Sequence, residues 1–211
     1  KSVFHQDKLD LAIKAFTTAI SIKPNYAEAH YYLGMAVMEQ GNLEKAIYAY
    51  KRAISIKPDY DEAYYYLGHA LTGVIFTKPS KDFQKTIISL LDGETYIRPR
   101  EISKTAISLL KFEPALQKHF QLVDYDEIDN VLGVISDLSE LSLLLKLMNV
   151  CPIPDLELEK LLKKLRHSIL SNISSLKEAS PELLKFQSAL ALQCFTNEYI
   201  YSYAEEEEKI L

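Results

Sequence analysis

The chain has 211 residues, of which 48% are hydrophobic and 25% are charged, and its formal net charge is −5 with a pI near 5.6. This composition can bury a core and is not that of a disordered chain. The acidic balance argues against a nucleic-acid-binding protein, which normally presents a basic face to phosphate groups. Because the sequence has neither an apolar run of about 18 residues nor a secretory leader, we expect no membrane span and a cytoplasmic location.

Small, aromatic and proline residues of the first part of the chain recur 34 positions later. The matching pairs are Ala12 and Ala46, Phe16 and Tyr50, Ala19 and Ala53, Pro24 and Pro58, and Tyr26 and Tyr60. Three dipeptides recur at the same offset, since Glu28-Ala29, Tyr31-Tyr32 and Leu33-Gly34 return as Glu62-Ala63, Tyr65-Tyr66 and Leu67-Gly68. Residues 27–60 form one full period, in which a Gly-Asn break separates two helical patterns.

A helix-turn-helix unit with this period resembles a tetratricopeptide repeat (TPR). Residues 7–23 resemble the second helix of a truncated first repeat, residues 27–60 a complete repeat, and Asp61 the start of a third. The period then fails, because Phe83 lies six residues later than the repeat requires. We expect a degenerate second helix from about Ser80 to Leu91, so the repeats would occupy residues 1–92 and end in an atypical unit.

The chain begins with Lys1, and residues 2–6 fall where the first helix of a repeat should end. We therefore expect this sequence to be a fragment of a longer protein.

Helical periodicity continues beyond the repeats, over residues 93–211. Two of its apolar stripes span Asp126 to Leu138 and Glu140 to Asn149. Helices are expected to start near Pro99, Pro114, Asp126, Glu140, Asp155 and Ser180. Because no β-type alternation competes, the sequence predicts an all-α fold, in which TPR units of a right-handed α-solenoid are followed by an accessory helical segment.

The accessory segment is similar to the helical region that lies between TPR arrays and a class I S-adenosylmethionine-dependent methyltransferase domain in bacterial fusion proteins. The residues that carry this resemblance are Pro152, Pro154, Asp155, Glu159, Leu162, Arg166, Gln193, Cys194, Phe195, Asn197, Glu198 and Tyr199. No glycine-rich turn follows a strand pattern, so the methyltransferase domain itself is not predicted within these residues.

The TPR resemblance implies that the first helix of each repeat lines a concave groove that binds peptides or protein surfaces. The implied groove positions are Glu28, Tyr31, Met35, Met38, Glu39, Glu62, Tyr65, His69 and Thr72. Groove lysines and asparagines, which clamp acidic chaperone tails in this family, are absent, so an acidic tail is a poor candidate. Tyr and Met favour an apolar or mixed peptide.

Tyr31 and Tyr65 are the expected anchors of this groove. Two alternatives stay open: some of the tyrosines pack against the next helix instead, or the second segment of the chain occupies the groove itself.

Other chemistries find little support in the sequence. The histidines are scattered without metal-ligand spacing, and His30 is expected in the core. Cys151 and Cys194 are expected to be buried free thiols. The acidic run from Asp124 to Asp129 is interpreted as a helix start, and the basic run from Lys160 to Arg166 as a solvated helix face.

The sequence therefore predicts a non-catalytic protein-interaction module without a cofactor. One alternative is the substrate-recruiting or regulatory region of a larger S-adenosylmethionine-dependent methyltransferase. A second is a scaffold that self-associates through the ends of its repeat stack.

Overall fold

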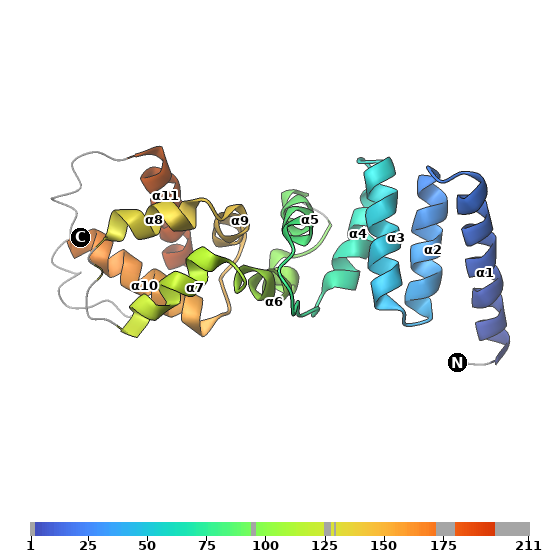
Figure 1. Cartoon of the computed structure of the whole chain (residues 1–211), viewed down its shortest axis with the longest axis horizontal. Coiled ribbons are helices and arrows are strands. Elements are labelled where there is room, and N and C mark those ends of the chain that lie inside the picture. Colours follow the sequence, from blue (N-terminus) through green and yellow to red (C-terminus); the bar gives the residue numbers. More distant parts are fainter. Residues whose placement is uncertain (1–2, 94–95, 125–127, 129, 172–179, 197–211) are drawn as a thin grey trace. The chain divides into compact units, whose positions relative to one another are not determined.

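The computed structural model describes residues 3–93, 96–124, 128, 130–171 and 180–196, and the regular structure of this part of the chain is entirely helical (Figure 1). The all-α prediction is confirmed. The helices belong to two compact units: the first contains Lys1–Val74 and Asp92–Arg98, and the second contains Ile75–Leu91 and Pro99–Leu211. The predicted division at residue 92 stays a prediction.

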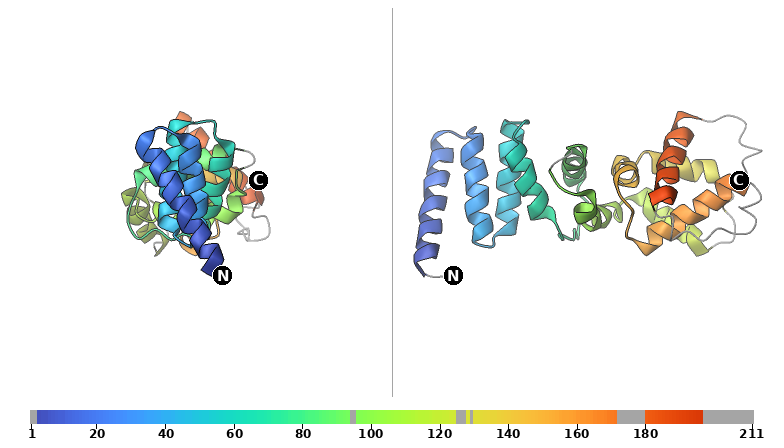
Figure 2. Two further views of the ribbon diagram at one scale, coloured as in Figure 1. Left: turned by 90° about the vertical axis from the view of Figure 1, so that its right-hand side faces the viewer. Right: turned by 180° about the vertical axis from the view of Figure 1, so that it is seen from behind.

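The first unit is a stack of four helices, which we call the repeat unit. Its helices are α1 (Val3–Ile22), α2 (Ala27–Glu39), α3 (Leu43–Ile56) and α4 (Asp61–Leu71). Each helix packs against the next one along the chain, as both side views show (Figure 2).

Helix α1 begins earlier than predicted. Residues 3–6, which we expected to end a preceding helix, form its first turns. No glycine or proline interrupts the chain between Val3 and Lys23, so nothing in the sequence breaks the helix there.

Local signals set the other helix ends of the repeat unit. Gly41 adopts φ of 87°, a left-handed conformation that ends α2 and suits glycine. The Asn42 side chain then caps α3 by accepting a hydrogen bond from the Lys45 amide at 3.2 Å. After the second helix of each repeat, a lysine amine lies over a tyrosine ring, Lys23 over Tyr26 at 5.1 Å and Lys57 over Tyr60 at 4.7 Å. The 34-residue period thus extends to this cation–π contact.

The closest approach of two helices in the repeat unit is between α2 and α3. A Cβ atom on Gly34 would lie only 2.6 Å from the Tyr50 ring. Tyr50, Ala46 and Ala53 are completely buried. The absent side chain at Gly34 therefore leaves the space that the Tyr50 ring fills.

Gly34→Ala is expected to destabilise the repeat unit. Overpacking a filled core costs roughly 1–3 kcal/mol, and the ~1 kcal/mol by which alanine favours a helix over glycine offsets only part of this. Urea unfolding followed by circular dichroism measures the loss. In a Tyr50→Leu background the same substitution should be much less harmful, and an equal loss in both backgrounds would contradict the steric explanation.

Gly68, the equivalent of Gly34 in the next repeat, has a different partner. A Cβ atom there would meet the Ile97 side chain at 3.1 Å, and Ile97 is buried. The neighbouring Tyr96 stacks on Tyr64 with ring centroids 4.7 Å apart, and its hydroxyl donates a hydrogen bond of 2.7 Å to Asp61. The returning segment, residues 96–98, thus covers α4 at the position that Tyr50 of the second helix covers in the preceding repeat.

A helix does form where the degenerate second helix was expected. It is α5 (Lys81–Asp92), and it is grouped with the second unit. Its predicted role as the second helix of a third repeat stays a prediction, whereas the contact at Gly68 is made by Ile97.

The second unit continues with helices whose starts mostly agree with the predicted ones. They are α6 (Pro99–Leu110), α7 (Pro114–Phe120), the 3-10 helix η1 (Gln121–Asp124), α8 (Val131–Ser139), α9 (Ser142–Val150), α10 (Leu156–Ser171) and α11 (Pro181–Thr196). The expected caps are confirmed: Asp155 accepts from the Leu158 amide at 3.1 Å and Ser180 from the Leu183 amide at 3.1 Å.

The predicted helix start at Asp126 is wrong. Helix α8 begins at Val131, after the Asn130 side chain accepts a hydrogen bond from the Gly133 amide at 2.9 Å. Asparagine is a better cap than the acidic residues before it are helix formers. Asp124 ends η1, while residues 125–127 and 129 lie outside the described residues, as does the predicted extension of the last helix beyond Thr196. Helix α9 likewise starts at Ser142 rather than Glu140.

Gln193 of α11 holds the connector between α9 and α10. Its amide nitrogen donates to the carbonyl oxygens of Met148 and Cys151 at 2.7 and 2.6 Å, and its amide oxygen accepts from the Ile153 amide at 3.2 Å. The side chain is completely buried. One residue thus satisfies three backbone groups that the proline-containing connector cannot pair within a helix.

Gln193→Met is expected to lower the free energy of unfolding of the second unit by about 3 kcal/mol or more, because each buried polar group left unsatisfied costs roughly 1–3 kcal/mol. Hydrogen exchange should show faster loss of protection at the Ile153 amide. Ser188→Ala, at an exposed position of the same helix, serves as the control and should change neither quantity. Unchanged protection of Ile153 in Gln193→Met would argue against the clamp.

Candidate functional site

A continuous row of aromatic rings crosses the repeat unit from α1 through α2 to α4. In order of contact it consists of Phe16, Tyr32, Tyr31, Tyr66, Tyr65 and His69, and we call it the aromatic row. Successive ring centroids are 5.6, 5.1, 5.7, 5.4 and 4.5 Å apart. These separations are those of stacked and edge-to-face aromatic pairs, which add to the stability gained from buried area.

Two buried tyrosines support the aromatic row. The Tyr60 ring lies 5.0 Å from that of Tyr31, and the Tyr50 ring lies 6.2 Å from Tyr31 and 6.0 Å from Tyr66. Within the described part of the chain, the buried Tyr50 hydroxyl has no hydrogen-bond partner. The row therefore rests on a packed layer of further rings.

The two expected anchors, Tyr31 and Tyr65, lie in different environments although they occupy equivalent repeat positions. Tyr31 is only 8% exposed, because Tyr60 and Tyr66 of the following repeat cover it. Tyr65 is 45% exposed, with ring contacts to Tyr66 and His69 of its own helix. The alternative interpretation, in which a tyrosine packs against the next helix, thus describes Tyr31.

The other predicted groove residues lie on the same two helices. Met35 and Met38 are half-buried, while the remaining five are exposed, namely Glu28, Glu39, Glu62, His69 and Thr72. The aromatic row brings His69 and Tyr65 together with Tyr31 through Tyr66. That these residues line one binding groove stays a prediction.

Sequence reasoning missed the two residues at the α1 end of the aromatic row. Tyr32 is 47% exposed, and its ring stacks on that of Phe16 with an interplanar angle of 18°. The recurrence of Tyr31-Tyr32 as Tyr65-Tyr66 was a signal for both members of the pair. Which member is exposed depends on the neighbouring helix, and that is not visible in the repeat pattern.

The buried tyrosines are weak acids in this environment. Burial, with smaller effects from Tyr66 and Glu62, raises the pKa of Tyr31 to about 12. Burial, followed by the nearby carboxylate of Glu28, raises the pKa of Tyr60 to about 12. Both residues keep their neutral form because an apolar surrounding disfavours the phenolate.

The stability of the repeat unit is expected to fall as the pH rises from about 10 to about 12. In this window the unfolded tyrosines ionise near their ordinary pKa of 10, whereas Tyr31 and Tyr60 remain protonated in the fold, so unfolding releases protons. Urea unfolding at several pH values measures this, and Tyr31→Phe should flatten the decline. A decline of equal slope in Tyr31→Phe would show that Tyr31 does not carry the effect.

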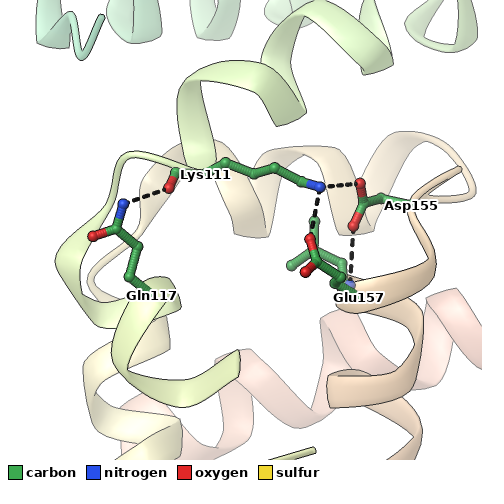
Figure 3. Close-up of polar contacts among 5 residues, drawn as sticks. Lys111, Gln117, Asp155 and Glu157 are labelled. Carbon is green, nitrogen blue, oxygen red and sulfur yellow. Dashed lines mark hydrogen bonds and ion pairs between the residues drawn. The ribbon is translucent and has the colours of Figure 1, made fainter. Parts of the chain in front are cut away.

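The polar clusters of the second unit have structural roles. Lys111 forms ion pairs of 2.8 Å with both Asp155 and Glu157, and the Gln117 side chain donates to the Lys111 carbonyl oxygen at 3.0 Å (Figure 3). Hydrogen bonds from the Lys111 amine to the two carboxylates raise the pKa of Lys111. These contacts join the α6–α7 turn to the start of α10, where Asp155 is also the helix cap.

A buried carboxylate, Glu113, is fully partnered. Burial alone would raise its pKa, but hydrogen bonds from Lys81 at 2.7 Å and Gln84 at 2.6 Å outweigh this effect, so the pKa is lowered. The buried His119 meets Asp137 at 2.8 Å, a pairing across 18 residues that the sequence did not indicate. Neither cluster adjoins a nucleophile in the contacts recorded for it.

No group of metal-ligating side chains converges within the described residues. Cys151 and Cys194 are free thiols; Cys151 is buried, which raises its pKa to about 11, and Cys194 is half-buried. His30 is buried as expected, and its ring nitrogen lies 3.0 Å from the Pro24 carbonyl oxygen.

A family model of the TPR repeat matches residues 2–41 and 35–73, the stretch that forms the four stacked helices. The first part of this chain consists of tetratricopeptide repeats. Repeats of this family typically bind proteins or peptides on extended surfaces and are generally non-catalytic. No curated protein matches the chain. The resemblance of the second unit to methyltransferase fusion proteins and the self-associating scaffold both stay predictions.

Among the described residues, no helix has the length and apolar character that crossing a membrane requires.

Proposed function

We propose that the repeat unit is a cytoplasmic protein-interaction module that binds a peptide segment of a partner on the face carrying the aromatic row. The observation that supports this most is the exposure of Tyr32 and Tyr65, at 47% and 45%, on a row whose central rings are buried. Large exposed rings held by packed neighbours are the kind of anchor that dominates binding energy at protein interfaces.

The fixed ring positions matter as much as the exposed area. Tyr32 is held by stacking on Phe16, and Tyr65 by edge contacts with Tyr66 and His69. A side chain that is already ordered loses less conformational entropy on binding. The half-buried thioethers of Met35 and Met38 add an adaptable apolar surface on α2. The partner segment is therefore expected to carry apolar side chains that contact the rings.

Binding is expected to depend on the exposed rings and stability on the buried one. Peptides selected from a phage-displayed random library on the full chain provide the ligand, and fluorescence anisotropy gives its Kd. Tyr65→Ala or Tyr32→Ala should weaken binding about tenfold, the effect of a moderate hot spot of ~1.4 kcal/mol, with a small change in melting temperature. Tyr31→Ala should lower the melting temperature instead, because it leaves a cavity among four rings.

The matched control is Tyr48→Ala, at a tyrosine of α3 that is 67% exposed and has no ring contact with the aromatic row in the described structure. Its Kd should equal that of the unmodified chain. If Tyr48→Ala weakens binding as much as Tyr65→Ala does, the peptide binds another face, and the proposal fails.

A further inference from the structure

Charge is divided unequally between the helices of the repeat unit. Helices α2 and α4, which begin the repeats, contain four acidic side chains and no lysine or arginine. Helices α1 and α3 contain the basic residues of the stack, namely Lys8, Lys14, Lys45, Lys51 and Arg52. The helices that supply most of the aromatic row are thus negatively charged, although the composition of the repeat unit as a whole is mixed.

Two of the four carboxylates flank the aromatic row. Glu28 and Glu62 occupy equivalent repeat positions, are exposed, and form no hydrogen bond or ion pair within the described part of the chain. Both carboxylates raise the pKa of Tyr60, so they approach the same hydroxyl from α2 and α4. Glu62 also acts on Tyr31 of the row. By contrast, Asp61 already accepts a hydrogen bond from Tyr96.

The repeat unit also shows how its tyrosines accommodate a cation. The amines of Lys23 and Lys57 lie over the rings of Tyr26 and Tyr60, at 5.1 and 4.7 Å. Lys57 is the basic group recorded on Tyr60, and it reaches that ring from the loop before α4 rather than from the face of α2 or α4. For Tyr32 and Tyr65 the recorded ring partners are aromatic, and both rings remain partly open to solvent.

We infer that the segment bound on this face is a basic peptide, whose lysine or arginine side chains lie against the Tyr32 and Tyr65 rings and pair with Glu28 and Glu62. This inference rests on the proposed function. Ring faces attract ammonium and guanidinium groups, and nearby carboxylates add Coulomb attraction that also rejects acidic segments. Apolar residues between the basic ones would contact Met35 and Met38.

The test uses the full chain and three fluorescein-labelled peptides of equal length, in which leucine alternates with arginine, serine or glutamate. The arginine peptide should bind most tightly, and its affinity should fall as ionic strength rises from about 0.01 M to about 0.15 M, where the Debye length shrinks from about 30 Å to about 8 Å. Glu28→Gln with Glu62→Gln should weaken its binding about three- to tenfold, since each exposed charge contact contributes roughly 0.5–1 kcal/mol.

The control is Asp7→Asn with Glu44→Gln, which removes the same number of charges from exposed positions of α1 and α3. It should leave the Kd of the arginine peptide unchanged, and an equal loss in both double variants would overturn the inference. Tight binding of the serine or glutamate peptide that is still lost in Tyr65→Ala would overturn the basic partner while leaving the proposed function intact. If none of the three peptides binds, and Tyr65→Ala also fails to affect the library-selected peptides, both proposals fall.

Discussion

The repeat unit depends on the contact between a helix backbone and one buried ring. Tyr50 is completely buried and lies against Gly34, so that α2 and α3 approach more closely than any other side chain at position 34 would permit. The same ring touches Tyr31 and Tyr66, and through them it supports the aromatic row that crosses α2 and α4. Packing between two helices and the presentation of exposed rings to a partner are therefore one arrangement, because both rely on the position of Tyr50.

The two faces of this arrangement differ in chemistry. Buried rings are neutral and resist ionisation, whereas the exposed rings lie on helices whose charged groups are carboxylates. Electrostatic complementarity mainly selects among partners and speeds their encounter, while ordered aromatic anchors set the affinity. A surface that combines both features separates these two roles between different residues, the glutamates for selection and the tyrosines for contact area.

Signals that act over a few residues could be predicted from the sequence. The 34-residue period located the helices of the repeat unit, and Asp155 and Ser180 cap the helices where expected. The exposure of individual tyrosines could not be predicted, because Tyr31 and Tyr65 are equivalent in the pattern and differ only in whether a following repeat covers them. The bonds of Gln193 to the connector join residues about 40 positions apart, and local patterns contain no information about such contacts.

The return of residues 96–98 to α4 makes the repeat unit discontinuous in the chain. Everything between Ile75 and Leu91, including α5, is grouped with the second unit, although it is synthesised before Tyr96 and Ile97. The repeat unit therefore cannot complete its packing at Gly68 until the ribosome has released residues that follow the first helix of its neighbour. No single cut of the polypeptide separates the two units without removing part of one, so each forms in the presence of the other.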